Sequence, residues 1–207
     1  TKLYDKEDAA GTLNETKYLQ FGDLFVNVKY KEKGNLDSAA MASYTLKAAD
    51  AFKKAFGKND KQSLAAFNVG VIYYTIFSDY DDKYSSNIRT MQQLNSNKPV
   101  EKDPRKKAAA DAKFKEQLDP LKQANAALDK PLTESIDQAI DWLTKSYTIL
   151  KDKADRTNVE KSVINKAVDF LTNLYSYKRD KARAKDPKAF DLYEAKFKEF
   201  DALHGKF

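Results

Sequence analysis

The stretch LAAFNVGVIYY, residues 64–74, constrains the fold of this chain more than any other feature. It is strongly apolar in a chain where 33% of the residues are charged, yet it is far shorter than the roughly 18 apolar residues that cross a bilayer. On a helix, Ala66, Val69, Gly70 and Tyr73 form one stripe, and apolar side chains also cover the other faces. A helix that is apolar all round is usually buried all round. We therefore expect a central helix here.

Apolar residues recur at three- and four-residue spacing along most of the chain, and two-residue alternation is absent, which predicts an all-α protein. Residues 1–12 are polar, contain Gly11 and predict a flexible arm. Helix-start signals occur at Asn59–Asp60 with Gln62, Asp103–Pro104, Asp119–Pro120, Pro131, Thr157 with Glu160, and Asp186–Pro187. We expect about seven helices, at residues 14–34, 36–56, 60–94, 104–128, 131–150, 157–175 and 186–200.

Two short patterns combine a glycine with aromatic side chains. They are Phe21-Gly22-x-x-Phe25 and Val69-Gly70-x-x-Tyr73. In each, a small residue follows a large apolar one, and an aromatic residue comes three positions later. The glycine leaves a hole that a side chain of a neighbouring antiparallel helix can fill. The complementary surface, two alanines around an aromatic residue, occurs at Ala48, Phe52 and Ala55.

These patterns resemble those of the tetratricopeptide repeat, in which a first helix carries the glycine-type pattern and a second helix the alanine-type pattern. Weaker copies are Leu171-Thr172-x-x-Tyr175 for a first helix, and Ala139, Leu143 and Ser146 for a second. The resemblance covers most of residues 14–200. It implies an antiparallel helix-pair array, a TPR-like α–α superhelix, in a single domain over residues 13–207.

The spacing departs from the family pattern. The repeat is nominally 34 residues long, whereas Gly22 and Gly70 lie 48 residues apart. The second helix expected after Tyr73 has Asp82 in the place of its alanine. We therefore expect residues 78–130 to be an irregular insertion or a drifted repeat. The alternative is a generic helical bundle with coincidental small-residue seams.

The composition argues against most catalytic chemistry. The chain has no cysteine and one histidine, His204, which leaves little for thiol, zinc or histidine-dependent catalysis. The acidic cluster SDYDD at residues 78–82 lacks the glycine and the distal glutamate of a calcium loop. Phosphate-binding loops and nucleophilic serine motifs are absent. We expect no cofactor, no metal site and no enzymatic activity.

The resemblance implies a groove lined by first-helix side chains, and hence a protein- or peptide-binding or scaffolding role. Carried over onto this sequence, the groove candidates are Gln20, Asp23, Asn27, Asn68, Tyr74, Lys166, Asn173 and Tyr177. Amides suit this role because one side chain both donates to and accepts from a peptide backbone. The apolar surroundings of Asn68 instead favour a buried amide that bonds within the protein and a Tyr74 that is not in an open groove.

A second function class rests on basic stretches at residues 98–115 and 177–188, which supply much of the net charge of +6. If Lys106, Lys107, Arg179 and Arg183 share one face, they favour docking on nucleic acid or an anionic membrane surface. Acidic residues are interleaved in both stretches, and stacking aromatics are scarce in the first. A protein or peptide partner is therefore preferred over nucleic acid, and the oligomeric state stays open.

The chain begins TKLYDKEDAAG, without methionine, as a mature or trimmed form does. A mature form after signal cleavage would place the protein outside the cytoplasm; we favour this location over the cytoplasm, and the sequence leaves the compartment open. The sequence contains no run long and apolar enough for a transmembrane helix.

Overall fold

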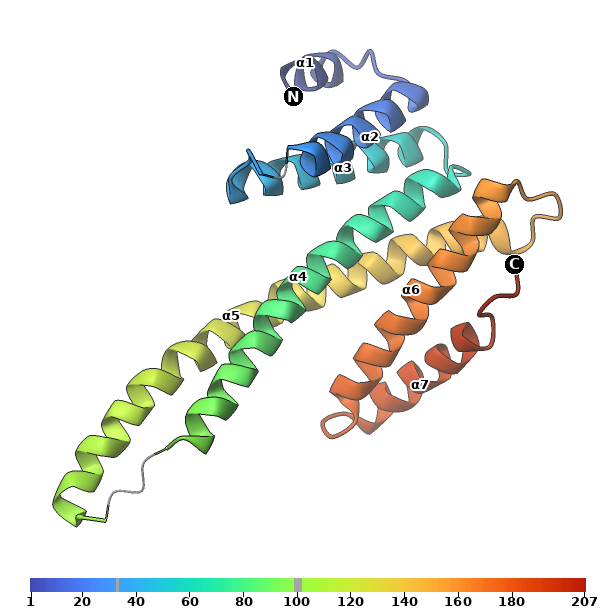
Figure 1. Cartoon of the computed structure of the whole chain (residues 1–207). Coiled ribbons are helices and arrows are strands. Elements are labelled where there is room, and N and C mark those ends of the chain that lie inside the picture. Colours follow the sequence, from blue (N-terminus) through green and yellow to red (C-terminus); the bar gives the residue numbers. More distant parts are fainter. Residues whose placement is uncertain (33, 99–101) are drawn as a thin grey trace. The chain divides into compact units, whose positions relative to one another are not determined.

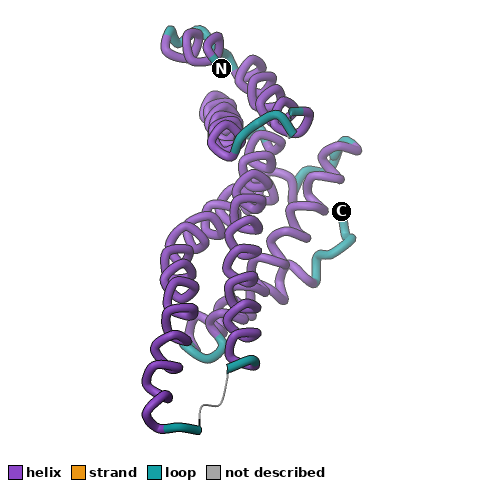
Figure 2. Tube along the Cα trace, turned by 60° about the vertical axis from the view of Figure 1, so that its left-hand side comes forward, coloured by secondary structure: helices purple, strands orange, loops and turns teal. Residues whose placement is uncertain are grey.

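The computed structural model describes residues 1–32, 34–98 and 102–207. Every regular element within them is a helix, which confirms the predicted all-α class (Figures 1 and 2). The seven helices of the described residues are α1 (Lys2–Ala9), α2 (Glu15–Lys31), α3 (Ser38–Lys58), α4 (Ser63–Ser96), α5 (Pro104–Lys151), α6 (Asn158–Ala182) and α7 (Pro187–Asp201). None of these helices is long and apolar enough to cross a membrane.

The chain divides into two compact units. Unit 1 contains Thr1–Tyr73 and Gln138–Phe207, and unit 2 contains Tyr74–Asp137. The sequence predicted one domain over residues 13–207 with an insertion at 78–130, and unit 2 includes the whole of that insertion. Helices α4 and α5 each contribute residues to both units.

Helices α2 and α3 pack side by side (Figure 1), and Gly22 of α2 lies against Phe52 of α3. A Cβ atom built on Gly22 would lie 2.6 Å from Cε1 of Phe52, so only a glycine leaves room for this ring. Phe52 is 1% exposed, and Ala48 and Ala55 beside it are also buried. The predicted hole and its complementary surface therefore meet in this pair.

The second close fit joins residues of α4 and α5 that are far apart in the sequence. A Cβ atom on Gly70 would lie 2.6 Å from Cγ of Leu143 and 3.1 Å from its backbone nitrogen. One turn further along α5, the Ser146 hydroxyl donates to the backbone oxygen of Ser63 at 3.0 Å. The second helix of this pair therefore comes after residues 74–137 in the sequence.

Helices α6 and α7 form the third pair. Helix α6 begins at the predicted capping box, in which Glu160 N–H donates to the Thr157 hydroxyl at 3.2 Å and Thr157 N–H donates to the Glu160 carboxylate at 2.9 Å. Helix α7 begins at the predicted Asp–Pro start, where Ala189 N–H donates to Asp186. The rings of Tyr175 and Phe200 stack with their centroids 5.7 Å apart.

The predicted start of α4 is wrong by a few residues. The sequence suggested a cap at Asn59–Asp60 with Gln62 in capping-box position, but α4 begins at Ser63. The side-chain amides of Asn59 and Gln62 instead donate to the Glu15 carboxylate of α2, at 3.1 and 2.7 Å. Asn59 Oδ1 still accepts locally, from Lys61 N–H at 3.0 Å, so the predicted cap closes the turn before α4.

Within residues 1–12, which the sequence predicts to be a flexible arm, Lys2–Ala9 form helix α1. Its Tyr4 is only 2% exposed and packs among aromatic rings of α2. Isolated helices of this length are marginal in water. Tertiary contacts therefore hold α1 in place.

Prolines do not end α5 where the sequence suggested breaks. The two helices expected at 104–128 and 131–150 are one helix that continues through Pro120 and Pro131. Each internal proline removes a backbone hydrogen bond at a cost of about 3 kcal/mol. Packing offsets this cost, because Leu118 and Leu132, close to the two prolines, are both buried. The described residues thus form seven helices, the number predicted, with α1 gained and two predicted helices merged.

Unit 2 is a hairpin of the second part of α4 and the first part of α5. Its buried apolar residues include Phe77, Leu118 and Leu132. A polar pair crosses its seam, where the Asn87 amide donates to Asn125 Oδ1 at 2.8 Å. Asn125 is only 6% exposed, and a buried amide pair of this kind fixes the register of two helices.

The glycine fit gives a direct stability prediction. Gly22→Ala should lower the free energy of unfolding by about 1–3 kcal/mol, because its methyl group overlaps a buried ring that has little room to move. Gly57→Ala is the matched control, since a Cβ atom there meets nothing within 4 Å. It should be neutral or stabilising by up to about 1 kcal/mol. Urea denaturation measures both, and equal effects would contradict the packing described.

Candidate functional site

The candidate residues on α2 lie on the side of the helix that faces away from its packing partners. The packing side carries the buried residues Tyr18, Gly22 and Phe25. The opposite side carries the exposed candidates Gln20, Asp23 and Asn27, and the exposed Leu24. Positions three, four and seven apart share a helix face. The structure therefore keeps these three candidates together and in contact with solvent.

Asp23 differs electrostatically from an ordinary surface carboxylate. Desolvation by the protein around it raises the pKa of Asp23 above its usual value, although the residue keeps contact with solvent. In the part of the chain that the structure describes, no hydrogen bond or ion pair engages its side chain. An ammonium or amide group from a partner would therefore find an unpaired acceptor at this position.

Asn68 lies on α4 at a junction with α6. The neighbouring Phe67 ring contacts the Phe170 ring of α6, with centroids 6.3 Å apart. Lys166 and Asn173 lie one turn before and one turn after Phe170, and both are exposed. We use the name α4–α6 seam for the contact of Phe67 with Phe170 and for the three candidates that flank it along the two helices, Asn68 on α4 and Lys166 and Asn173 on α6.

The structure departs from the expectation that Asn68 is buried and bonded within the protein. Asn68 is half-buried, and its side chain makes no hydrogen bond with any residue in the described ranges. A half-buried amide keeps both its donor and its acceptor capacity when nothing in the protein uses them. The seam therefore contains a half-buried amide on α4 and an exposed lysine and a second, exposed amide on α6.

The remaining candidates are placed less favourably. Tyr177 of α6 is half-buried, and the Lys181 ammonium lies 5.2 Å from its ring centroid. Tyr74 is half-buried and begins unit 2, to which the exposed Lys106 and Lys107 also belong. The structure thus places Gln20, Asp23 and Asn27 on one face of α2, which we call the α2 row, separate from the α4–α6 seam. The other four candidates, Tyr74, Tyr177, Lys106 and Lys107, belong to neither group.

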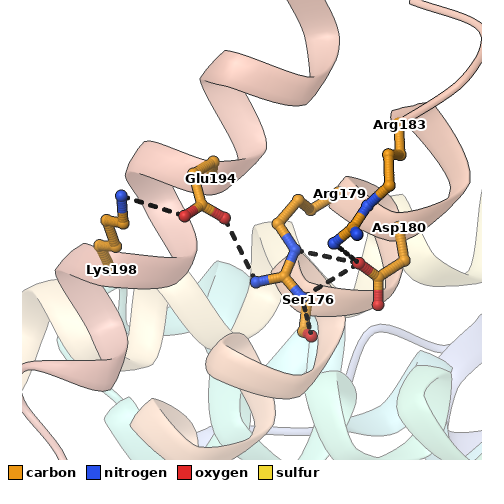
Figure 3. A network of polar contacts seen from close by, with 6 residues as sticks. All are labelled: Ser176, Arg179, Asp180, Arg183, Glu194 and Lys198. Carbon is orange, nitrogen blue, oxygen red and sulfur yellow. Dashed lines mark hydrogen bonds and ion pairs between the residues drawn. The ribbon is translucent and has the colours of Figure 1, made fainter.

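Two of the predicted basic residues take part in an internal network of α6 and α7. Figure 3 shows the Arg179 guanidinium between Asp180 and Glu194, to which it donates at 3.0 and 3.2 Å. Its side chain is 16% exposed and lies over the Phe197 ring. Arg183 also donates to Asp180, at 3.2 Å. Acidic neighbours compensate both charges, which weakens the interpretation of this segment as an anion-docking surface.

The same network shifts the ionisation of its carboxylate. A hydrogen bond from Lys198 first, and then one from Arg179, holds the pKa of Glu194 below its usual value. The pKa of Arg179 is raised, because its bonds to Asp180 and Glu194 outweigh the desolvation that opposes its charge. These groups stay charged at neutral pH and serve the packing of α6 on α7.

Sequence reasoning missed a polar and aromatic socket around α1. Tyr4 contacts the rings of Phe21 and Phe25 with centroids 5.2 Å away in each case, and its hydroxyl donates to Asp50 at 2.6 Å. Burial and then the bond to Asp50 raise the pKa of Tyr4 far above its usual value. The sequence signal for this socket is Tyr4 followed by several acidic residues. This segment is too short to show a helical periodicity.

An open pocket of about 420 Å³ lies along α5 in unit 1. Its lining residues are Lys61, Asp141, Thr144, Lys145, Thr148 and Ile149. Lys145 is held by Asp141 at 2.6 Å, while the buried Thr144 hydroxyl has no hydrogen-bond partner in the described part of the chain. None of the predicted residues lines this pocket, so it is separate from the candidate site.

No family model, curated protein or solved structure matches this chain. Within residues 1–32, 34–98 and 102–207, no group of three or more His, Cys, Asp or Glu side chains could hold a metal ion. The functional argument therefore starts from the side chains of the α2 row and the α4–α6 seam.

The network of Figure 3 can be tested by substitution. Arg179→Lys should lower the free energy of unfolding by about 1–2 kcal/mol, because an ammonium cannot bond Asp180, Glu194 and Ser176 together. Arg183→Lys is the matched control, since its side chain is 65% exposed, and it should change stability by less than about 0.5 kcal/mol. If urea denaturation gives similar decreases in the free energy of unfolding for both variants, the network does not contribute to stability.

Proposed function

We propose that this chain is a non-catalytic, TPR-like module that binds a peptide or protein segment at the first helices of its helix pairs. The observation that carries the proposal is Asn68, a half-buried amide without a hydrogen bond to any described residue, at the α4–α6 seam. Water can reach this half-buried amide, so its donor and acceptor are open to exchange for the hydrogen bonds of a ligand.

The chemistry of the seam indicates which part of a partner it binds. The Asn68 amide can donate to a backbone carbonyl and accept from a backbone N–H of an extended peptide. Lys166 and Asn173 on α6 are exposed and provide a cation and a second amide. We therefore expect an extended segment with an acidic side chain or carboxylate within reach of Lys166.

The helix pairing supports the TPR-like part of the proposal. Both glycine patterns of the first helices, at Gly22 and Gly70, receive a side chain from a second helix, Phe52 and Leu143. Interlocking of this kind uses one side of each first helix and leaves the other side for a partner. On α2 that other side carries Gln20, Asp23 and Asn27.

A peptide library displayed on phage and selected on the wild-type chain tests the proposal. For the best binder, Asn68→Ala should raise Kd about ten-fold, which corresponds to about 1.4 kcal/mol and to the loss of one or two hydrogen bonds. Lys166→Glu should raise Kd at least as much, with a smaller effect at high salt.

Gln123→Ala, which removes an exposed amide of unit 2, serves as the control and should leave Kd unchanged. A library without binders would contradict the proposal. So would a binder whose Kd is insensitive to both seam substitutions.

A further inference from the structure

The socket that holds α1 is built from α2 and α3, and its lining is specific for a tyrosine. The Tyr4 ring meets Tyr18, Phe21 and Phe25 edge-on. The ammonium groups of Lys47 and Lys54 lie 5.7 Å from its ring centroid. The hydroxyl donates to Asp50, so a ring without a hydroxyl would lose this bond.

The rim of the socket is basic where α1 is acidic. Lys54 bonds the Asp8 carboxylate at 2.6 Å, and the Tyr18 hydroxyl donates to the same carboxylate at 2.8 Å. Lys47 pairs with Asp5, and Lys17 with Glu7 at 3.6 Å. The socket therefore holds α1 by one tyrosine and by carboxylates one, three and four residues after it.

The attachment of α1 is of the kind that opens locally. Tyr4 is the buried side chain of this eight-residue helix. The carboxylates of the helix make ion pairs with partly exposed lysines and accept one hydrogen bond from Tyr18. Elements with few buried apolar contacts open without global unfolding. A turn links α1 to α2, in which Gly11 has φ +66° and Leu13, two residues later, is 2% exposed. Opening at this turn would release α1 and leave Leu13 in place.

We propose that the α2–α3 socket is an exchangeable docking site for a short acidic helix that carries a tyrosine, supplied by another protein, and that α1 is its resident competitor. The partner would present a tyrosine with carboxylates one and four residues after it, as Tyr4, Asp5 and Asp8 do in α1. This site is distinct from the α4–α6 seam and does not depend on its function. Partner binding would displace α1, so a partner helix must bind the socket tightly enough to compete with α1.

A labelled peptide of residues 1–12 is the probe, and the receptor is the full chain with Tyr4→Ala, in which the resident is weakened. By fluorescence anisotropy, the peptide should bind this receptor at least ten-fold more tightly than it binds the wild-type chain. The peptide with Tyr4→Ala should bind neither. Equal binding to both receptors, or no binding to a folded Tyr4→Ala chain, would overturn the proposal.

Charge exchange tests the recognition chemistry. A receptor with Tyr4→Ala and Lys54→Glu should bind the original peptide at least ten-fold more weakly, and the peptide with Asp8→Lys should recover most of the loss. If binding is lost and the Asp8→Lys peptide does not recover it, Lys54 does not recognise Asp8. If the wild-type chain sediments as a dimer that the peptide dissociates, the socket holds α1 of a second copy, and the proposed partner is wrong.

Hydrogen exchange on the unmodified chain tests the opening itself, independently of any variant. The amides of α1 should exchange at least about ten-fold faster than the core amides of α3, because α1 opens on its own. Exchange of α1 at the rate of global unfolding would make it a fixed part of the core and would overturn the proposal.

Discussion

The contact between Gly70 and Leu143 is the constraint on which the rest of unit 1 depends. It joins the start of α4 to the end of α5, and the space at Gly70 admits no side chain larger than hydrogen without displacing Leu143 or its backbone. The two helices of this pair are therefore separated in the sequence by residues 74–137, which form unit 2. The same pair positions Phe67 against Phe170 of α6, so the seam that presents Asn68 follows from it.

Local patterns predicted much of this fold. The glycine of α2, the aromatic residue of α3 and the caps of α6 and α7 are encoded within a few residues, and each was placed correctly. The patterns around Gly70 and Leu143 are both visible in the sequence, but the sequence does not pair them. A regular repeat predicts that the second helix follows directly after Tyr73. The prolines of α5 show the same limit, since local rules count the lost hydrogen bond and omit the packing that offsets it.

The candidate site shows where sequence reasoning stops. The outward side of α2 could be predicted, because a helix that packs through Tyr18, Gly22 and Phe25 must expose the opposite face. For Asn68 the sequence supported two opposite interpretations, and only the tertiary surroundings place it at a half-buried seam. The role of Arg179 could not be derived either, because Glu194 comes from another helix. The socket of Tyr4 likewise depends on partners more than forty residues away.

A double-mutant cycle on Gly70 and Leu143 tests the central pairing most directly. Leu143 is fully buried, so Leu143→Ala alone should cost about 2–5 kcal/mol through the cavity it leaves. Gly70→Ala alone should cost about 1–3 kcal/mol through overlap. The double variant should cost at least about 1 kcal/mol less than the two single costs together, because the new methyl group enters the new cavity. Strictly additive free energies of unfolding would contradict the pairing on which this account rests.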